Sequence, residues 1–181
     1  MDKQLKELMG NWIQAIGTVI SAIGSTPSTI LSEDFRKDLG LVGNVLQGAG
    51  NALLADVERE ITLEKIGNEI QAIGNSTVVA GMIIDFEEET QQKLIITGNW
   101  FQALGGLTSI GDELQDESGQ PLNIIANLLQ SIGNSMQALG GIVELQYGEA
   151  AKEKSQRYEI NGSWIQAVGS VLSLLIQIEE E

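Results

Sequence analysis

The side chains of this sequence that could do chemistry are carboxylates. They occur in short runs, such as residues 85–89 and 112–117. Neighbouring carboxylates can act as an acid and base pair or bind a hard cation such as Ca²⁺. The runs lack the Asp-x-Asp-x-Asp-Gly spacing of an EF-hand, and the Glu-x-x-His motif of a di-metal helical bundle does not occur. The acidic runs therefore predict no specific metal site.

Other catalytic chemistry finds little support in the composition. The 181 residues include no cysteine and no histidine, which excludes thiolate nucleophiles, imidazole bases and the usual zinc, copper and haem ligands. The glycines do not form a GxxxxGK[ST] phosphate loop. We expect neither an enzyme nor a cofactor.

The charge balance restricts the partners. Ten basic and 25 acidic side chains give a formal net charge of −15, which repels nucleic acid and anionic lipid surfaces. With 43% apolar residues and a mean hydropathy of +0.04, the chain can still bury a core. Its length predicts a single domain over residues 1–181, the alternative being a division into 1–114 and 121–181 at the loop before Pro121.

The N-terminus predicts no Sec export. Residues 1–7 are charged and helix-like, unlike a signal peptide, and no window of eighteen residues is continuously apolar. We expect a cytoplasmic protein, and release by a non-Sec route is compatible with the same sequence.

One phrase, Gly-Asn-x-apolar-Gln-Ala-apolar, occurs six times with small variations. The copies begin 24–35 residues apart, at Gly10, Gly43, Gly67, Gly98, Gly133 and Gly162. Within them glycines recur every seven residues, and apolar residues follow the i, i+3, i+4, i+7 spacing of a helix face. The sequence predicts an all-α protein of six amphipathic helices from six degenerate repeats of about 30 residues, in a closed bundle or an open array. The expected ranges are 2–24, 32–55, 58–82, 86–111, 120–147 and 150–178.

Glycine inside a helix costs about 1 kcal/mol relative to alanine, so two or three per helix need an offset. A close approach of neighbouring backbones along a glycine seam would supply it. The alternative is that some glycines end helices, as Gly24 and Gly111 would.

The repeated blocks are almost free of charge, and their polar side carries Asn and Gln where a water-facing helix would have Lys and Glu. Amides both donate and accept, so they can join similar helices and set their register. We expect a self-association interface; a solvated polar face is the alternative. The interface residues are Gly10, Asn11, Gln14, Gly17, Gly43, Asn44, Gln47, Gly67, Asn68, Gln71, Gly98, Asn99, Gln102, Gly105, Gly133, Asn134, Gln137, Gly162, Gln166 and Gly169.

Three tryptophans, Trp12, Trp100 and Trp164, share one motif position at the border of the apolar stripe. Packing explains them best, although membrane-surface helices also carry tryptophan at such a border.

The repeated phrase resembles a family of small repetitive helical proteins of unknown function from spore-forming Gram-positive bacteria. That resemblance spans all six blocks and implies no activity, cofactor or active-site residue.

These features favour a structural or scaffold protein that assembles with itself into a filament or large oligomer through neutral Gly/Asn/Gln helix faces. The alternative is a membrane-active or pore-forming helical protein, which the acidic balance disfavours.

Overall fold

The computed structural model describes residues 2–57, 59–114 and 121–179, and these residues confirm the all-α class. The elements are α1 (Lys3–Ser25), α2 (Glu33–Val57), α3 (Leu63–Ile83), α4 (Glu88–Glu113), α5 (Pro121–Tyr147), the 3₁₀ helix η1 (Gly148–Ala151) and α6 (Lys152–Glu179). No strand occurs within these described ranges.

The connection between α5 and α6 differs from the prediction of six separated helices. Residues 121–179 are helical without a break, so the described chain forms five uninterrupted helical segments, the last of which contains both α5 and α6. The chain reverses at η1, where Gly148 has φ +54°. This left-handed conformation is open to glycine without the steric cost that a Cβ would add. The turn is therefore itself helical rather than a loop.

The start of α3 is a second correction. A helix was predicted from residue 58, which lies outside the described residues, but α3 begins at Leu63. Thr62 is extended, with φ −111° and ψ 164°, and its side chain accepts a hydrogen bond from the Lys65 amide at 3.0 Å. A threonine at this position satisfies one of the free amides of the first turn and so defines the helix start.

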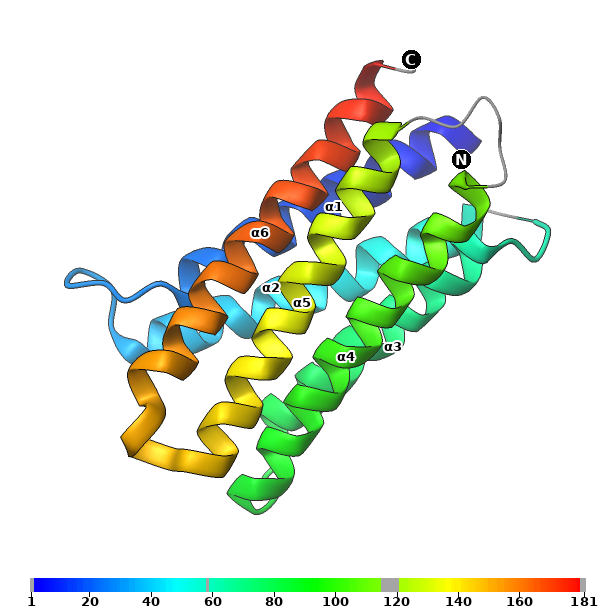
Figure 1. Cartoon of the computed structure of the whole chain (residues 1–181). Helices are drawn as coiled ribbons and strands as arrows, with labels where there is room; N and C mark the ends of the chain where they lie inside the picture. The colour runs from blue at the N-terminus through cyan, green and yellow to red at the C-terminus, as the bar shows by residue number, and fades with distance from the viewer. Residues whose placement is uncertain (1, 58, 115–120, 180–181) are drawn as a thin grey trace.

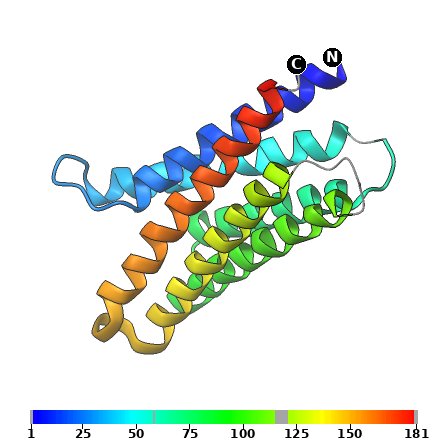
Figure 2. The same cartoon turned by 45° about the horizontal axis from the view of Figure 1, so that its top comes forward.

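The helices form a closed ring rather than an open array. Each helix packs against its neighbours in the chain, and α6 packs back against α1 (Figures 1 and 2). In Figure 2 the C-terminal part of α6 runs beside the N-terminal part of α1. Within the described residues, helices on opposite sides of the ring have no close backbone contact. Side chains fill the space between them.

The ring is built from three helix pairs, α1/α2, α3/α4 and α5/α6, each closed along a glycine seam. A Cβ placed on Gly43 would lie 2.6 Å from the carbonyl oxygen of Gly17. The corresponding distances are 2.6 Å from Gly74 to the Gly98 oxygen and 2.5 Å from Gly133 to the Gly162 oxygen. These separations leave no room for a side chain, which confirms the predicted close approach of backbones.

Gly24 and Gly111 do not end helices, contrary to the alternative interpretation. Both are helical, and a Cβ on Gly24 would lie 2.6 Å from the Arg36 carbonyl oxygen. Gly24 therefore continues the seam between α1 and α2, while a Cβ on Gly111 would meet the side chain of Leu63. Close contact, rather than a helix stop, explains both glycines.

The distribution of polar and apolar side chains is inverted relative to an ordinary globular protein. The largest fully buried side chains are Asn51, Asn75, Asn134, Thr18, Ser163 and Ser170. The three tryptophans, in contrast, lie on the outside with 41–47% of their surface exposed. Because glycine seams draw the backbones together, most inward-facing positions hold small and amide side chains, and only a few large apolar ones, such as Ile110 and Leu174, are buried.

Candidate functional site

Amide side chains meet in the middle of the ring, in a cluster that we call the amide core. Its members are Gln14, Gln47, Asn51, Gln102, Gln130, Gln137 and Gln166. Gln166 on α6 is its hub: its Nε2 donates to Gln47 Oε1 at 2.7 Å and to Gln102 Oε1 at 3.4 Å. Its own Oε1 accepts from Gln137 Nε2 at 2.9 Å. One side chain thus joins α6 to α2, α4 and α5.

Gln14 makes a second set of links from α1. Its Nε2 donates to Asn51 Oδ1 at 2.6 Å and to Gln130 Oε1 at 3.2 Å. Gln130 in turn donates to Ser173 Oγ at 3.3 Å, and Gln47 donates to Ser21 Oγ at 3.0 Å. The three helix pairs are therefore held together by hydrogen bonds between neutral groups that are shielded from water.

The structure brings the predicted interface residues together inside one chain. All twenty are buried except Asn44 and Gln137, which are half-buried. Asn44 does not reach another helix; its Nδ2 donates to the Gly40 carbonyl oxygen at 2.9 Å. The alternative interpretation, a polar face exposed to solvent, is therefore wrong. Each amide face is covered by neighbouring helices of the same molecule.

Several buried amides were missed in the sequence because they lie outside the repeated phrase. Asn51 and Asn75 lie seven residues after the phrase asparagines Asn44 and Asn68, and Gln130 lies seven residues before Gln137. They are 1–3% exposed. The seven-residue period that identified the glycines could have found them, because residues seven apart share a helix face.

Among the residues that the structure describes, three buried amide atoms have no protein hydrogen-bond partner: Asn75 Oδ1, Gln102 Nε2 and Asn134 Nδ2. An amide does not titrate and is no nucleophile, so the amide core can hold helices in register but cannot supply acid–base or covalent catalysis. Within the described residues, no group of three or more His, Cys, Asp or Glu gathers as a metal site would require.

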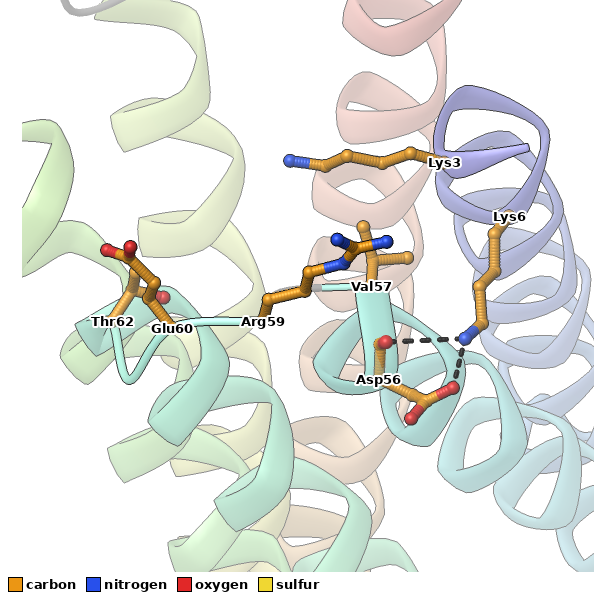
Figure 3. A pocket seen from close by; sticks show the side chains of 7 residues that line it. All are labelled: Lys3, Lys6, Asp56, Val57, Arg59, Glu60 and Thr62. Atoms are coloured by element: carbon orange, nitrogen blue, oxygen red, sulfur yellow. Dashed lines mark hydrogen bonds and ion pairs between the residues drawn. The ribbon is translucent and has the colours of Figure 1, made fainter. Parts of the chain in front are cut away.

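One end of the bundle carries a hollow of about 480 Å³ between the start of α1, the end of α2 and the segment before α3 (Figure 3). The Lys6 amine donates to the Asp56 carboxylate and, at 3.3 Å, to the backbone carbonyl oxygen of Asp56. This hydrogen bond lowers the pKa of the exposed Asp56 carboxyl. Lys3, Arg59 and Glu60 also line the hollow. Because charges of both signs mix there, the hollow selects neither anions nor cations.

Glu159 is the titratable group whose environment is most unusual. Burial raises its pKa to about 7, and the Glu144 carboxylate on α5 adds to the shift. Its side chain lies on the α5/α6 seam, where a Cβ on Gly140 would be 3.1 Å from Glu159 Cγ.

The outer surface offers a second candidate site. A groove of about 330 Å³ runs along α1 and α6 and is lined by Val19, Trp164, Ala167, Val168, Val171, Leu172 and Leu175. Within the described residues, none of the helices is both long and apolar enough to cross a bilayer. All seven residues that line the groove are apolar.

Comparison with known proteins agrees with the expected resemblance to a family without an assigned function. No curated protein and no solved structure matches the chain. A family described as a family of unknown function (DUF6944) matches residues 5–174, a range that contains all six copies of the repeated phrase. The chain therefore belongs to this family of unknown function, DUF6944.

Proposed function

We propose that this protein is a structural protein that assembles with further copies of itself through the apolar outer surface of its helix ring. The observation that carries the proposal is the side-chain distribution: amide, serine and alanine side chains make up much of the interior, while all three tryptophans and many leucines and isoleucines are exposed. Exposed apolar patches beyond a few hundred Å² are rare on monomers and mark interaction surfaces.

The charges of the chain support this assignment because they leave most of the outer belt free. Five of the six α-helices have a central stretch without ionic side chains, for example residues 94–111 of α4 and 160–178 of α6, and the exception is α3 with the exposed Glu69. Trp100, Leu104 and Leu107 lie exposed within the first of these stretches. Burying apolar surface gains roughly 25 cal/mol per Å², and a belt without charges can be buried without desolvating ions.

The amide faces have a different role in this proposal from the one expected from the sequence. They bind the three helix pairs to each other within one chain, with Gln166 as the hub. Their hydrogen bonds hold the large apolar side chains on the outside. The contact between copies is then apolar, and the charged ends of the helices limit its extent.

Light scattering on the purified protein tests the proposal. We expect particles much heavier than the 19.4 kDa monomer, with a mass that rises with protein concentration. Sodium sulfate should increase the mass, because it strengthens apolar association and screens the net charge. Association through ion pairs would weaken with salt instead. A monomer over the whole micromolar range, with and without sulfate, would refute self-assembly.

A membrane-active protein is the second candidate, because a charge-free apolar belt between charged ends would also contact lipid. Vesicles of neutral phosphatidylcholine separate the two functions. The self-assembling protein should leave them intact and remain in the supernatant at low-speed sedimentation, whereas a membrane-active protein should bind them and release a trapped dye.

A further inference from the structure

One glutamine of the amide core differs from the others in its hydrogen bonds. Gln14, Gln47, Gln137 and Gln166 hold the same place in the repeated phrase, and the Nε2 of each donates to an oxygen of another side chain. Gln102 holds that place on α4 and is 2% exposed. It accepts from Gln166, but within the described part of the chain its own Nε2 has no protein partner. The shared phrase therefore does not explain how this N–H group is satisfied.

The helices α4 and α5 pack in one antiparallel register. A Cβ on Gly106 of α4 would meet the side chain of Ser131 on α5, and a Cβ on Gly141 of α5 would lie 2.7 Å from Ile96 Cγ1 of α4. In both pairs, each step forward along α4 corresponds to one step back along α5. The turn before Gly106 is therefore level with the turn after Ser131.

Gln102 and Asn134 occupy these two turns. Asn134 is fully buried, and its Nδ2, like Gln102 Nε2, has no partner among the described protein atoms. Two amide N–H groups from adjacent helices thus lie at the same level of the interior without an acceptor. The unpartnered Asn75 Oδ1 belongs to another boundary, because Asn75 packs against Gly48 between α2 and α3.

The hydrogen bonds of the core fix the orientation of both amides. Gln102 Oε1 accepts from Gln166 Nε2 at 3.4 Å, and Asn134 Oδ1 accepts from Gln137 Nε2 at 3.5 Å. Exchanging the oxygen and the nitrogen of either amide would place two donors against each other. The unpaired atom of each side chain is therefore the nitrogen.

We propose that a water molecule is bound between α4 and α5, where it accepts hydrogen bonds from Gln102 Nε2 and Asn134 Nδ2. A buried amide N–H without a partner is costly, and a bridging water satisfies it almost as well as a direct hydrogen bond. Water accepts two hydrogen bonds, which matches the two donors. Ser131 Oγ, one turn before Asn134, donates to the Asn127 carbonyl oxygen at 2.8 Å and keeps lone pairs that can accept from the water.

A neutral ligand fits this place better than an ion. Residues 94–111 of α4 and 121–143 of α5 carry no ionic side chain, so an anion would lose its hydration without gaining a countercharge. A cation would face the positive ends of two N–H groups. The residues that adjoin the pair on the same turns, Ala103 and Ala138, are small and buried, which suits a ligand of the size of water.

The water links two of the three helix pairs. Gln166 donates to Gln47 of the α1/α2 pair at 2.7 Å, but to Gln102 of the α3/α4 pair at 3.4 Å. A water held by Gln102 and Asn134 adds a connection between the α3/α4 and α5/α6 pairs, where the direct hydrogen bond is long. This inference concerns the interior of one chain and is independent of the proposed self-assembly.

A crystal structure of the natural protein grown in sodium bromide tests the site directly. We expect a density peak at about 2.7–3.2 Å from both Gln102 Nε2 and Asn134 Nδ2, without anomalous signal from bromine. An anomalous peak there would identify a halide and overturn the water. The absence of a peak that contacts both nitrogens, including a direct hydrogen bond of either one to a protein oxygen instead, would also overturn the proposal.

Magnetic relaxation dispersion of the water signal tests the site in solution, because it counts water molecules that stay bound while the protein tumbles. Asn134→Leu keeps a similar shape but removes the donor, and it should lower the dispersion amplitude by about one water molecule. Asn161→Leu is the matched control: it makes the same change at an exposed position of α6 and should leave the amplitude unchanged.

Gln102→Met removes the other donor and should cause the same loss, so it replaces Asn134→Leu if circular dichroism shows that the latter is unfolded. Equal amplitudes in the natural protein and in either folded donor variant would contradict a water bound by these two amides.

Discussion

The glycine seam makes a sharp prediction on a single helix. Gly40 and Gly43 lie one turn apart on α2, and replacing each with alanine adds the same methyl group. At Gly43 the new Cβ would lie 2.6 Å from the Gly17 carbonyl oxygen of α1. At Gly40 the nearest atom is Met82 Cε at 3.6 Å, an ordinary contact. The two variants therefore differ in the space around the methyl group rather than in its chemistry.

The expected stability changes have opposite signs. In a helix interior alanine is better than glycine by about 1 kcal/mol, so Gly40→Ala should raise the free energy of unfolding by about 0.5–1 kcal/mol. Gly43→Ala gains the same helix propensity, but the contact with backbone forces α1 and α2 apart by several tenths of an ångström. Overpacking of this kind costs about 1–3 kcal/mol, and a separated seam also loses contacts along its length. We expect a net destabilisation of about 1–2 kcal/mol.

Thermal unfolding followed by circular dichroism measures the difference. For a chain of this size 1 kcal/mol corresponds to roughly 2–4 °C, so a gap of about 2–3 kcal/mol separates the two Tm values by about 5–10 °C. Protein concentration must be equal in all samples, because self-association also raises Tm. If Gly43→Ala were as stable as Gly40→Ala, the seam would not be the reason for the glycines.

Three further predictions concern the core, a carboxyl group and a helix start. Gln166→Leu should lower the free energy of unfolding by about 2–4 kcal/mol, since it leaves several buried amides unpaired. The control variant Gln156→Leu, on the exposed side of α6, should change this free energy by less than about 0.5 kcal/mol. Urea unfolding measures both changes. Glu159→Gln should have the same free energy of unfolding as the natural protein below pH 4.5, and should become more stable than it, by at most about 3 kcal/mol, as pH rises through 7. The reason is that the fold favours the protonated Glu159 carboxyl, whose pKa is raised. Parallel curves of Tm against pH for the two proteins would contradict this prediction. Thr62→Ala should destabilise the protein by about 1 kcal/mol through loss of the bond to the Lys65 amide, and an unchanged urea midpoint would show that this cap contributes nothing.

Much of the local structure followed from the repeat. The seven-residue glycine period and the spacing of Trp12, Ile16 and Val19 are properties of one helix face, so they predicted helices and a close backbone approach without knowledge of the partner. Helix ends were less accessible. Thr62 fixes the start of α3, and Gly148 allows the helical turn between α5 and α6. Each of these features depends on a single residue, so the periodic pattern did not predict it.

The neutral amide face predicted that these helices are covered by protein. The polar side of a water-facing helix usually carries Lys and Glu, and this chain, although rich in carboxylates, has Asn and Gln there instead. What covers it depends on which repeats meet, and six nearly identical phrases carry no information about that choice. The tertiary structure decided it by bringing α6 back to α1, so that Gln166 reaches Gln47 and Gln102 inside one ring. Local spacing is written in each helix, whereas the pairing of equivalent faces is a property of the whole chain, and only its closure left the large apolar side chains on the outside.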